Sequence, residues 1–212
     1  MRQLPGGTPV GAVAVGSPGV TVPAEDDEEA ALLAAFANGD RQAAAVLTER
    51  LTPRAFGVAY RLLGDRAEAE DIAQEAMVRL WRMAPDWEPG RARVSTWVYR
   101  VVTNLCLDHK RRRRGRDGAL EDAPEPMDEA PSVPERMQDA ARGAALQWAL
   151  DQLSDRQRLA VVLRHLQDLP NPRIAEVMEI SVEAVESLTA RGKRTLTRLL
   201  QDRKGELGYE DD

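Results

Sequence analysis

Two dense clusters of basic side chains are the strongest indication of a binding function in this sequence. The block Lys110–Arg116 holds six cations in seven positions, and a second cluster lies at Arg191–Arg194. Guanidinium and ammonium groups at this density bind phosphates, which supply much of the affinity for nucleic acid. The first block continues a segment with apolar residues at helical spacing: Val98, Val101, Val102 and Leu105. We therefore expect one amphipathic helix over Ser95–Arg116 that presents Arg100, Asn104 and the basic block to an anionic polymer.

Catalytic and metal-binding patterns are missing from the sequence. Cys106 is the single cysteine, which excludes an internal disulfide and a cysteine zinc site. His109 and His165 are isolated, and there is no Gly-rich phosphate loop or Ser–His–Asp candidate set. We therefore expect no enzymatic activity, no metal and no cofactor. A lone cysteine on an apolar helix is more often buried packing than a redox sensor, and the redox activity of Cys106 stays open.

The net charge of −6 would argue against nucleic acid if it were evenly spread. The acid is instead concentrated in Glu25–Glu29, Asp117–Asp139 and Glu206–Asp212, which carry −5, −7 and −4. The rest of the chain carries +10. We therefore expect basic folded parts joined by acidic segments.

Composition divides the chain into helical and irregular parts. Residues 1–24 are rich in Gly, Pro, Ala and Val and are expected to be disordered, residues 117–139 form a flexible acidic linker, and residues 202–212 form an acidic tail. Helical patterns fill residues 25–116 and 140–201, and no strand pattern or internal repeat is visible. The prediction is an all-α chain of two small helical domains. A secretory signal and a bilayer-spanning apolar run are both missing, so we expect a cytosolic protein.

Helix signals are sharp in the first domain. Apolar spacing predicts helices from residue 28, over 41–63 and over 66–83, with Asn38-Gly39-Asp40 and Gly64-Asp65 as stop and cap signals. Pro53 is expected to kink the second helix or split it in two. Residues 85–93 form a loop by composition, and Ser95 is expected to cap the next helix. The expected core residues are Ala31, Leu32, Ala35, Phe36, Val46, Leu47, Leu51, Val58, Leu62, Leu63, Ile72, Ala76, Leu80, Trp81 and either Met77 or Val78.

The second domain has the dimensions of a helix-turn-helix. A helix from about Met137 leads to a capping box, Ser154-x-x-Gln157, and Asn171 is expected to cap a short helix from Pro172. A turn at Glu179–Ser181 precedes a longer helix from Val182 to about Leu200. The expected buried residues are Leu159, Val162, Leu163, Leu166, Ile174, Ala175, Val177, Met178, Val185, Leu188, Gly192, Leu196 and Leu199. This geometry lets the last helix enter the DNA major groove, although a helical hairpin in an ordinary bundle has the same pattern. The cations at 191–194 favour DNA.

Two aromatic residues at the start of the basic helix, Trp97 and Tyr99, are candidates for stacking on single-stranded bases. Core packing is the alternative for one of them, and Trp97 is the stronger candidate for the core. Acidic residues on the preceding helix, Glu68 to Glu75, indicate a binding face.

Two long stretches resemble a known family. Residues 65–114, DRAEAEDIAQEAMVRLWRMAPDWEPGRARVSTWVYRVVTNLCLDHKRRRR, resemble the promoter-melting domain of sigma-70-type factors. Residues 150–200, LDQLSDRQRLAVVLRHLQDLPNPRIAEVMEISVEAVESLTARGKRTLTRLL, resemble their helix-turn-helix domain. With a linker between them, the chain is similar over about residues 28–115 and 140–200 to the small extracytoplasmic-function (ECF) sigma factors.

The resemblance implies three sets of binding residues. Those matching the surface that docks on the clamp coiled coil of the RNA polymerase β′ subunit are Asp71, Gln74, Glu75, Arg79 and Trp81. Those matching the −10 DNA surface, where the loop Trp87–Val94 captures a flipped base, are Trp87, Arg91, Arg93, Ser95, Trp97, Tyr99, Arg100, Asn104, Lys110, Arg111 and Arg114. Those matching the −35 reader are Arg173, Ser181, Glu183, Glu186, Ser187, Ala190, Arg191, Lys193 and Arg194. The implied partners are core RNA polymerase, including its β flap, promoter DNA and an anti-sigma factor, and the implied mechanism is binding without turnover.

Three positions depart from the family pattern. Glu179 stands where the family usually has Gly in the turn, and a left-handed backbone there costs Glu roughly 1 kcal/mol relative to Gly. Pro170 replaces the usual Ser or Thr cap, for which Asn171 can substitute. Glu186 stands at a position that is often basic in the family. We therefore expect this chain to read an unusual −35 sequence, for example one in which Glu186 accepts a hydrogen bond from a cytosine amine. The alternative function is a stand-alone helix-turn-helix regulator, and a further one is an adaptor that binds polymerase without DNA.

Overall fold

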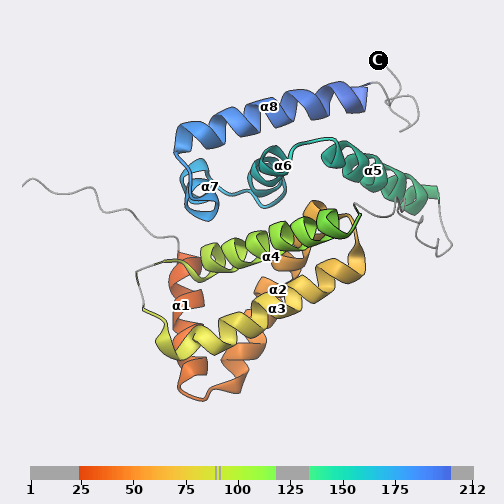
Figure 1. The fold of residues 1–212 in the computed structure, drawn as a ribbon. Helices are drawn as coiled ribbons and strands as arrows, with labels where there is room; N and C mark the ends of the chain where they lie inside the picture. Colours follow the sequence, from red (N-terminus) through yellow and green to blue (C-terminus); the bar gives the residue numbers. More distant parts are fainter. Residues whose placement is uncertain (1–23, 89, 91, 118–133, 202–212) are drawn as a thin grey trace, which may run out of the picture.

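The computed structural model describes residues 24–88, 90, 92–117 and 134–201 (Figure 1). All regular structure in these residues is helical, which confirms the all-α prediction. The helices are α1 (Ala24–Ala37), α2 (Arg41–Leu63), α3 (Arg66–Met83), the 3₁₀ turn η1 (Ala84–Asp86), α4 (Val94–Asp117), α5 (Pro134–Asp151), α6 (Asp155–Val161), the π-helical segment η2 (Val162–Leu166), α7 (Asn171–Met178) and α8 (Val182–Gln201). The segments expected to be a disordered extension, most of the linker and the acidic tail lie outside the described residues, although 134–139, assigned to the linker, are helical.

Local capping signals define α2 and α3 as predicted. The Asp40 carboxylate accepts hydrogen bonds from the backbone N–H groups of Gln42 and Ala43, at 2.8 and 3.2 Å. Gly64 ends α2 with a left-handed φ of 78°, and the Asp65 carboxylate accepts from Glu68 N–H at 2.8 Å to start α3. Pro53 lies inside α2, which continues through it as one helix and is not split. Gly64 and Asp65 thus separate α2 from α3, and the two helices pack against each other beneath α4 (Figure 1).

The first helix differs from its prediction. It begins at Ala24, four residues before the predicted start of the helical pattern at residue 28, and so includes Glu25–Glu29. Its fully buried residue is Leu33, with 0% exposure, whereas Ala31 is exposed. Glu29 is also buried, at 3% exposure. Leu32 and Phe36 of the predicted face are half-buried against the core, so the prediction was wrong in including Ala31 and in missing Leu33. Alanine occupies so much of this helix that its apolar face is poorly marked in the sequence.

Helix α4 begins one residue before its predicted cap. Val94 is the first helical residue, and Ser95 lies buried in the first turn instead of capping it. The Ser95 backbone N–H donates to the Glu29 carboxylate of α1 at 3.1 Å, so a side chain 66 positions away satisfies the helix start. The predicted serine cap was wrong because a partner distant in sequence fills that role.

The last four helices form the expected helix-turn-helix. The Ser154 hydroxyl accepts from Gln157 N–H at 3.4 Å and caps α6, as predicted. On α8 the stripe Val185, Gly192 and Leu196 is buried, which confirms the predicted face. A Cβ on Gly192 would lie 2.6 Å from Val161 Cγ2, so the absence of a side chain lets α8 approach α6 closely.

Two local predictions in this part were wrong. Leu166, expected inside, is 38% exposed, because the chain leaves α6 through η2 and turns the side chain outward. Asn171, expected to cap α7, is its first residue, and the buried Asn171 Oδ1 has no hydrogen-bond partner among the described residues. The flanking Pro170 makes no side-chain cap either.

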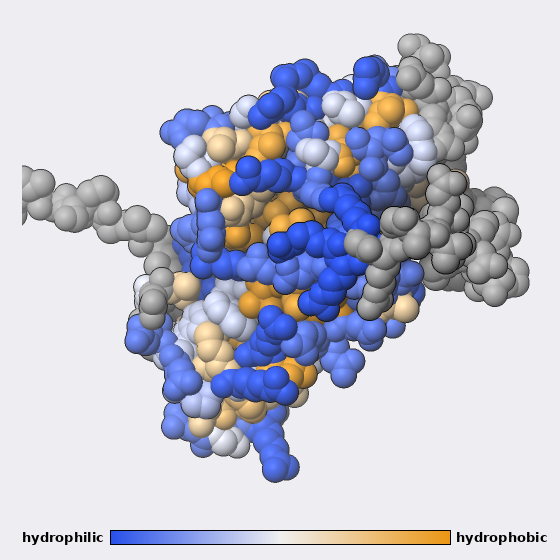
Figure 2. All heavy atoms as spheres, in the orientation of Figure 1, coloured by the Kyte–Doolittle hydropathy of each residue, from blue (hydrophilic) through white to orange (hydrophobic). Residues whose placement is uncertain are grey.

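The two halves of the molecule contact each other. Helix α4 packs against α7, and α2 packs against α5 and α6, so that α4 lies between the lower helices and the helix-turn-helix (Figure 1). Buried residues of both halves belong to one hydrophobic cluster. On the face drawn in Figure 2, hydrophobic residues show through between hydrophilic side chains along this junction.

Candidate nucleic-acid interface

The outer face of α8 brings together most of the residues predicted to read duplex DNA. Those exposed are Glu183, Glu186, Ser187, Ala190, Arg191, Lys193 and Arg194. Ser181 precedes the helix and its hydroxyl accepts from Ala184 N–H at 3.2 Å. The polar row is rigid because the opposite side of α8 packs on α6 and α7. A helix held on one side and polar on the other can present its side chains to a groove.

Glu183 stays anionic at the start of α8. Hydrogen bonds from its own backbone N–H and from Ser181 lower the pKa of its carboxyl group below the usual value. The positive end of the helix dipole also favours a carboxylate there. A carboxylate at this end can accept hydrogen bonds from amine donors and repels phosphates.

The turn between α7 and α8 has the shape that the sequence predicted, at a cost. Glu179 ends α7 with φ 54° and ψ 46°, which is the left-handed region. Its backbone N–H donates to Ala175 O, and Ile180 N–H donates to the same carbonyl at 3.2 Å. Glycine adopts this conformation with less strain than glutamate does.

Arg173 does not lie with the α8 residues. Its Nε donates to the Thr96 hydroxyl at 2.9 Å, and its Nη2 donates to the Ser95 hydroxyl. Both hydroxyls belong to the first turn of α4. A residue predicted for the −35 set therefore joins a residue predicted for the −10 set, Ser95.

The α4 residues predicted to hold single-stranded DNA divide into exposed and covered groups. Asn104, Arg111 and Arg114 are exposed, whereas Ser95 and Tyr99 are buried at 2% and 3%. The Tyr99 hydroxyl donates to the Gln167 side-chain oxygen at 3.1 Å, and burial raises the pKa of this phenol. The expectation that Trp97 is the core aromatic was wrong, since Trp97 is only half-buried. Tyr99 points toward η2 and Trp97 to the edge of the core.

The loop before α4 is only partly described. Trp87 is half-buried against the core, with Nε1 buried and without a hydrogen-bond partner in the described residues. Arg93 is half-buried, and Arg91 lies outside the described residues. The Trp87 ring therefore helps to fix the loop to the bundle.

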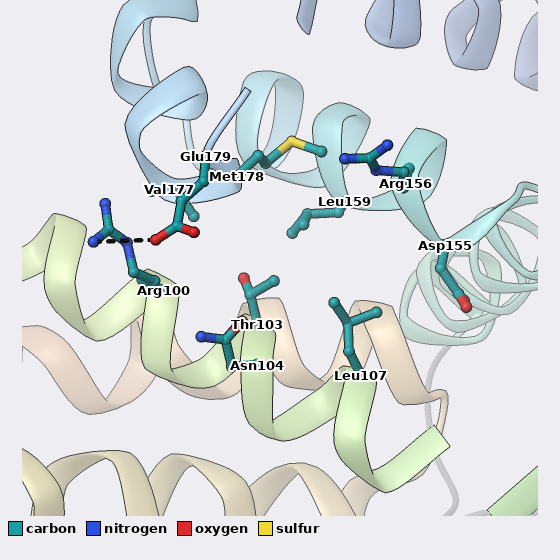
Figure 3. Close-up of a pocket in the computed structure, with 10 residues that line it drawn as sticks. All are labelled: Arg100, Thr103, Asn104, Leu107, Asp155, Arg156, Leu159, Val177, Met178 and Glu179. Atoms are coloured by element: carbon teal, nitrogen blue, oxygen red, sulfur yellow. Dashed lines mark ion pairs between the residues drawn. The ribbon is translucent and has the colours of Figure 1, made fainter. Parts of the chain in front are cut away.

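Arg100, Lys110 and Arg114 of α4 contact acidic and carbonyl groups of the second half of the chain. Arg100 Nη2 donates to Glu176 O at 2.7 Å, and Nη1 lies 3.5 Å from the Glu179 carboxylate (Figure 3). Lys110 Nζ and Arg114 Nη2 lie 2.5 and 3.0 Å from the two carboxylate oxygens of Asp155. We call these contacts of α4 with Asp155, Glu176 and Glu179 the α4 junction.

The sequence did not indicate the acceptors in the α4 junction. Asp155 looked like part of a capping box, and Glu176 offers only its backbone carbonyl. Glu179 was noted only as a departure from the family's glycine, with no contact predicted for its side chain. Arg158 was also missed: it is 5% exposed, and its Nη1 donates to Leu62 O at 2.8 Å across the two halves.

A separate polar face lies on α3. Asp71, Gln74 and Arg79 are exposed, and Glu75 is half-buried with its carboxylate 2.8 Å from Arg79 Nε. Trp81 packs edge-on against the Phe36 ring, with centroids 4.8 Å apart. The predicted polymerase-binding residues thus share one helix, with Trp81 turned toward α1.

Other chemistry finds little support in the described residues. They contain no group of three or more His, Cys, Asp or Glu placed to hold a metal ion. Cys106 is fully buried, and burial raises the pKa of its thiol to about 12, which keeps it protonated and unreactive. Within the same part of the chain, none of the helices has the length and apolarity needed to cross a bilayer.

Comparison with known proteins decides the family. The family model for Sigma-70 region 2 matches residues 47–116, and that for Sigma-70 region 4 matches residues 144–196. The ECF RNA polymerase sigma factor SigM of Mycobacterium tuberculosis is 32% identical over 172 residues, covering 81% of this chain and 84% of SigM. The chain belongs to the ECF family of RNA polymerase sigma factors. The region 2 match contains α3, all but the last residue of α4 and most of α2, and the region 4 match contains α6, α7 and most of α8.

Two further relatives support this assignment. The ECF sigma factor SigE of Mycolicibacterium smegmatis is 35% identical over 164 residues, which cover 76% of this chain but only 62% of SigE. The solved structure of CnrH, in complex with the cytosolic domain of CnrY, is 25% identical and has a TM-score of 0.62. That match covers 83% of this chain and 99% of CnrH. The α4 junction therefore joins region 2 to region 4 of an ECF-type chain.

Proposed function

We propose that this sigma-family chain directs core RNA polymerase to a restricted set of promoters. The observation that carries the proposal is the outer face of α8, where a continuous polar and basic row lies opposite a buried stripe in a helix-turn-helix. In this function the chain binds and positions its partners and turns over no substrate. Because bacterial core polymerase works in the cytoplasm, the function implies that compartment.

Helix α8 would read the −35 element in the major groove. Arg191, Lys193 and Arg194 supply phosphate or guanine contacts, and Ser187 and Ala190 lie between them on the exposed face. Glu183 and Glu186 would accept hydrogen bonds from base amines, such as that of cytosine. The acidic pair sets the base preference, and the cations supply most of the affinity.

Helix α4 and the loop before it would hold the melted −10 strand. Arg100, Asn104, Lys110, Arg111 and Arg114 follow one another along α4 with an exposed or half-exposed side chain. Extruding a base costs a few kcal/mol, which contacts with polymerase and the single strand would offset. Stacking by Trp97 would add to this, because an aromatic ring accepts any base.

The polar face of α3 would dock on the clamp coiled coil of the β′ subunit. Asp71, Gln74 and Arg79 are exposed there, and the packing of Trp81 on Phe36 holds the end of the helix in place. Region 4 would contact the β flap. We further propose control by an anti-sigma factor, supported by CnrH, a relative solved with the cytosolic domain of a second protein.

Pull-down of core polymerase tests the docking face. The double variant Asp71→Lys/Glu75→Lys should lose most of the captured polymerase, because it reverses two charges on the α3 face. Glu49→Lys, an exposed position on α2, is the matched control and should capture as much as the wild type. Equal capture by the double variant would contradict the assignment of this face.

Binding to duplex promoter DNA separates the sigma function from a stand-alone helix-turn-helix regulator. A sigma factor should bind the duplex weakly alone and tightly with core polymerase. Tight and specific binding by the purified chain alone would favour the regulator. An adaptor that needs no DNA would keep its transcription activity after Arg191→Ala/Lys193→Ala.

A further inference from the structure

Helix α1 lies outside the residues that the Sigma-70 region 2 model matches, and it contacts the elements on both sides of the loop before α4. The match begins at residue 47, whereas α1 ends at Ala37. Helix α1 packs against η1, which precedes the loop, and against α4, which follows it (Figure 1). Near its end, the Phe36 ring packs edge-on against Trp81 of α3, with centroids 4.8 Å apart. The two ends of the loop therefore rest on one helix.

The start of α4 lacks a local cap. Arg93 precedes the first helical residue, Val94, and the Arg93 carbonyl accepts from Trp97 N–H at 3.0 Å. A residue in this position usually offers a side-chain oxygen to the N–H group of the second or third helical residue. An arginine side chain has only donors and cannot do so. The second helical residue is Ser95, so its N–H group needs an acceptor from elsewhere in the chain.

Glu29 of α1 supplies that acceptor. Its Oε2 accepts from Ser95 N–H at 3.1 Å, and its Oε1 lies 3.3 Å from Arg54 Nη1 of α2. The Glu29 side chain is 3% exposed, and the positive end of the α4 dipole favours a carboxylate there. One buried carboxylate thus joins α1, α2 and the first turn of α4.

A packing role alone does not account for a charged group at this position. Burial of a carboxylate is costly unless hydrogen bonds and an opposite charge compensate for it. An apolar side chain, like the buried Leu33 of the same helix, would fill the space without that cost. A carboxylate adds a directed bond, which holds Ser95 N–H at one place relative to α1. Because Ser95 follows the loop directly, the bond also fixes where the loop ends.

We propose that Glu29 is a positioning residue for −10 recognition: from α1 it holds the first turn of α4, and so fixes the loop that captures a flipped base. Glu29 itself is buried and acts through Ser95. The role of the loop rests on the proposed function. The attachment of α4 to α1 does not, because it is a property of the chain alone.

Hydrogen exchange of the free, full-length chain tests the attachment. Glu29→Ala removes the acceptor, and Glu29→Gln keeps an oxygen there but removes the charge. Amide exchange in the first turn of α4, residues 94–97, should become roughly tenfold faster in Glu29→Ala, because a charged hydrogen bond is lost. Exchange in α8 reports any general loss of stability and should rise less. Glu28→Ala is the matched control, since it removes an exposed neighbour paired with Arg50 and should leave the first turn of α4 unchanged.

Promoter fragments with abasic sites test the role in recognition. Core polymerase with the chain is bound to a duplex fragment drawn from the promoters that it transcribes, with one non-template base of the −10 element removed at a time. The wild type should bind the intact fragment more tightly than the fragment that lacks the captured base. Glu29→Ala should reduce this ratio of affinities roughly fivefold, and Glu29→Gln should reduce it less, because glutamine keeps an acceptor. The ratio does not depend on the folded fraction, so it separates positioning from a loss of stability.

Unchanged exchange at residues 94–97 in both Glu29 variants would overturn the attachment. Faster exchange there with an unchanged ratio of affinities would overturn the role in −10 recognition, and so would an equal effect of Glu28→Ala on that ratio. Failure of the proposed function would look different: the wild type with core polymerase would favour no promoter and no −10 base. The recognition role of Glu29 would then fall with it, while hydrogen exchange would still decide the attachment.

Discussion

At position 179 a glutamate adopts backbone angles that favour glycine, and the energetic cost can be measured. We predict that Glu179→Gly raises the free energy of unfolding by about 0.5 kcal/mol, because strain relief exceeds the added freedom of the unfolded chain. The lost ion pair with Arg100 is exposed and contributes little. Urea denaturation checks this against Glu179→Ala, which removes the carboxylate but keeps the Cβ. A glycine variant less stable than the alanine variant would contradict the strain argument.

Gly192 is required by the close approach of α8 to α6. Gly192→Ala should lower the free energy of unfolding by about 1–3 kcal/mol, because its Cβ would lie 2.6 Å from Val161 Cγ2. Helix propensity alone predicts the opposite sign. Gly143→Ala in α5 is the control, since nothing lies within 4 Å of the added Cβ and the helix should gain up to about 1 kcal/mol. Equal effects at the two glycines in urea denaturation would show that α6 yields to the new methyl group.

At the scale of elements, sequence reasoning succeeded where the deciding partner is local. Asp40, Gly64 and Asp65 act within a few residues of themselves, and α2 and α3 have the predicted bounds. The α8 stripe was also readable, because its period alone identifies the buried side. Ser95 failed as a predicted cap because the acceptor at the start of α4 comes from Glu29 of α1.

The candidate site divides in the same way. The exposed faces of α3 and α8 follow from helical spacing, so their residues lie together as predicted. Helical spacing did not predict the positions of Arg173 and Tyr99, because each contacts a residue in the other half of the chain. No local pattern encodes which side of a helix a distant domain will cover.

The buried Glu29 gives an element-scale prediction. Its carboxylate accepts from Ser95 N–H at 3.1 Å and from Arg54 Nη1 at 3.3 Å, so it joins α1, α2 and α4. Glu29→Gln should lower the free energy of unfolding by about 1–3 kcal/mol, because a buried charged hydrogen bond is lost. Urea denaturation measures the change, and Glu28→Gln, an exposed neighbour paired with Arg50, should have little effect. Similar changes for both variants would contradict the role of Glu29.

At the scale of the whole molecule, the packing of the two halves against each other should be insensitive to pH near neutrality. Burial raises the pKa of Asp155, but the hydrogen bond and charge of Lys110, together with Arg114, outweigh it and lower the pKa below 3.8. Arg158 adds a further cation nearby. A lowered carboxyl pKa contributes stability that is present above the unfolded pKa and lost as pH falls through the folded one. Energy transfer between dyes on Glu49→Cys in α2 and Arg198→Cys in α8, both exposed positions, should stay constant from neutral pH down to about pH 5. Opening within that range would contradict the Asp155 contacts.

The whole chain also explains how an acidic protein can bind DNA. Its net charge is −6, yet the cations of α4 and α8 occupy two defined helix faces. On α4, Arg100, Lys110 and Arg114 form ion pairs with Glu179 and Asp155 of region 4, while the cations of the α8 row are exposed.

Transcription in vitro with core polymerase over a pool of genomic promoters tests the central claim most directly. The account predicts that adding the chain produces transcripts from a restricted set of promoters that share −35 and −10 elements. These transcripts should disappear with Asp71→Lys/Glu75→Lys and fall strongly with Arg191→Ala/Lys193→Ala. Transcripts no different from those of core polymerase alone would contradict the assignment of this chain as a promoter-directing sigma factor.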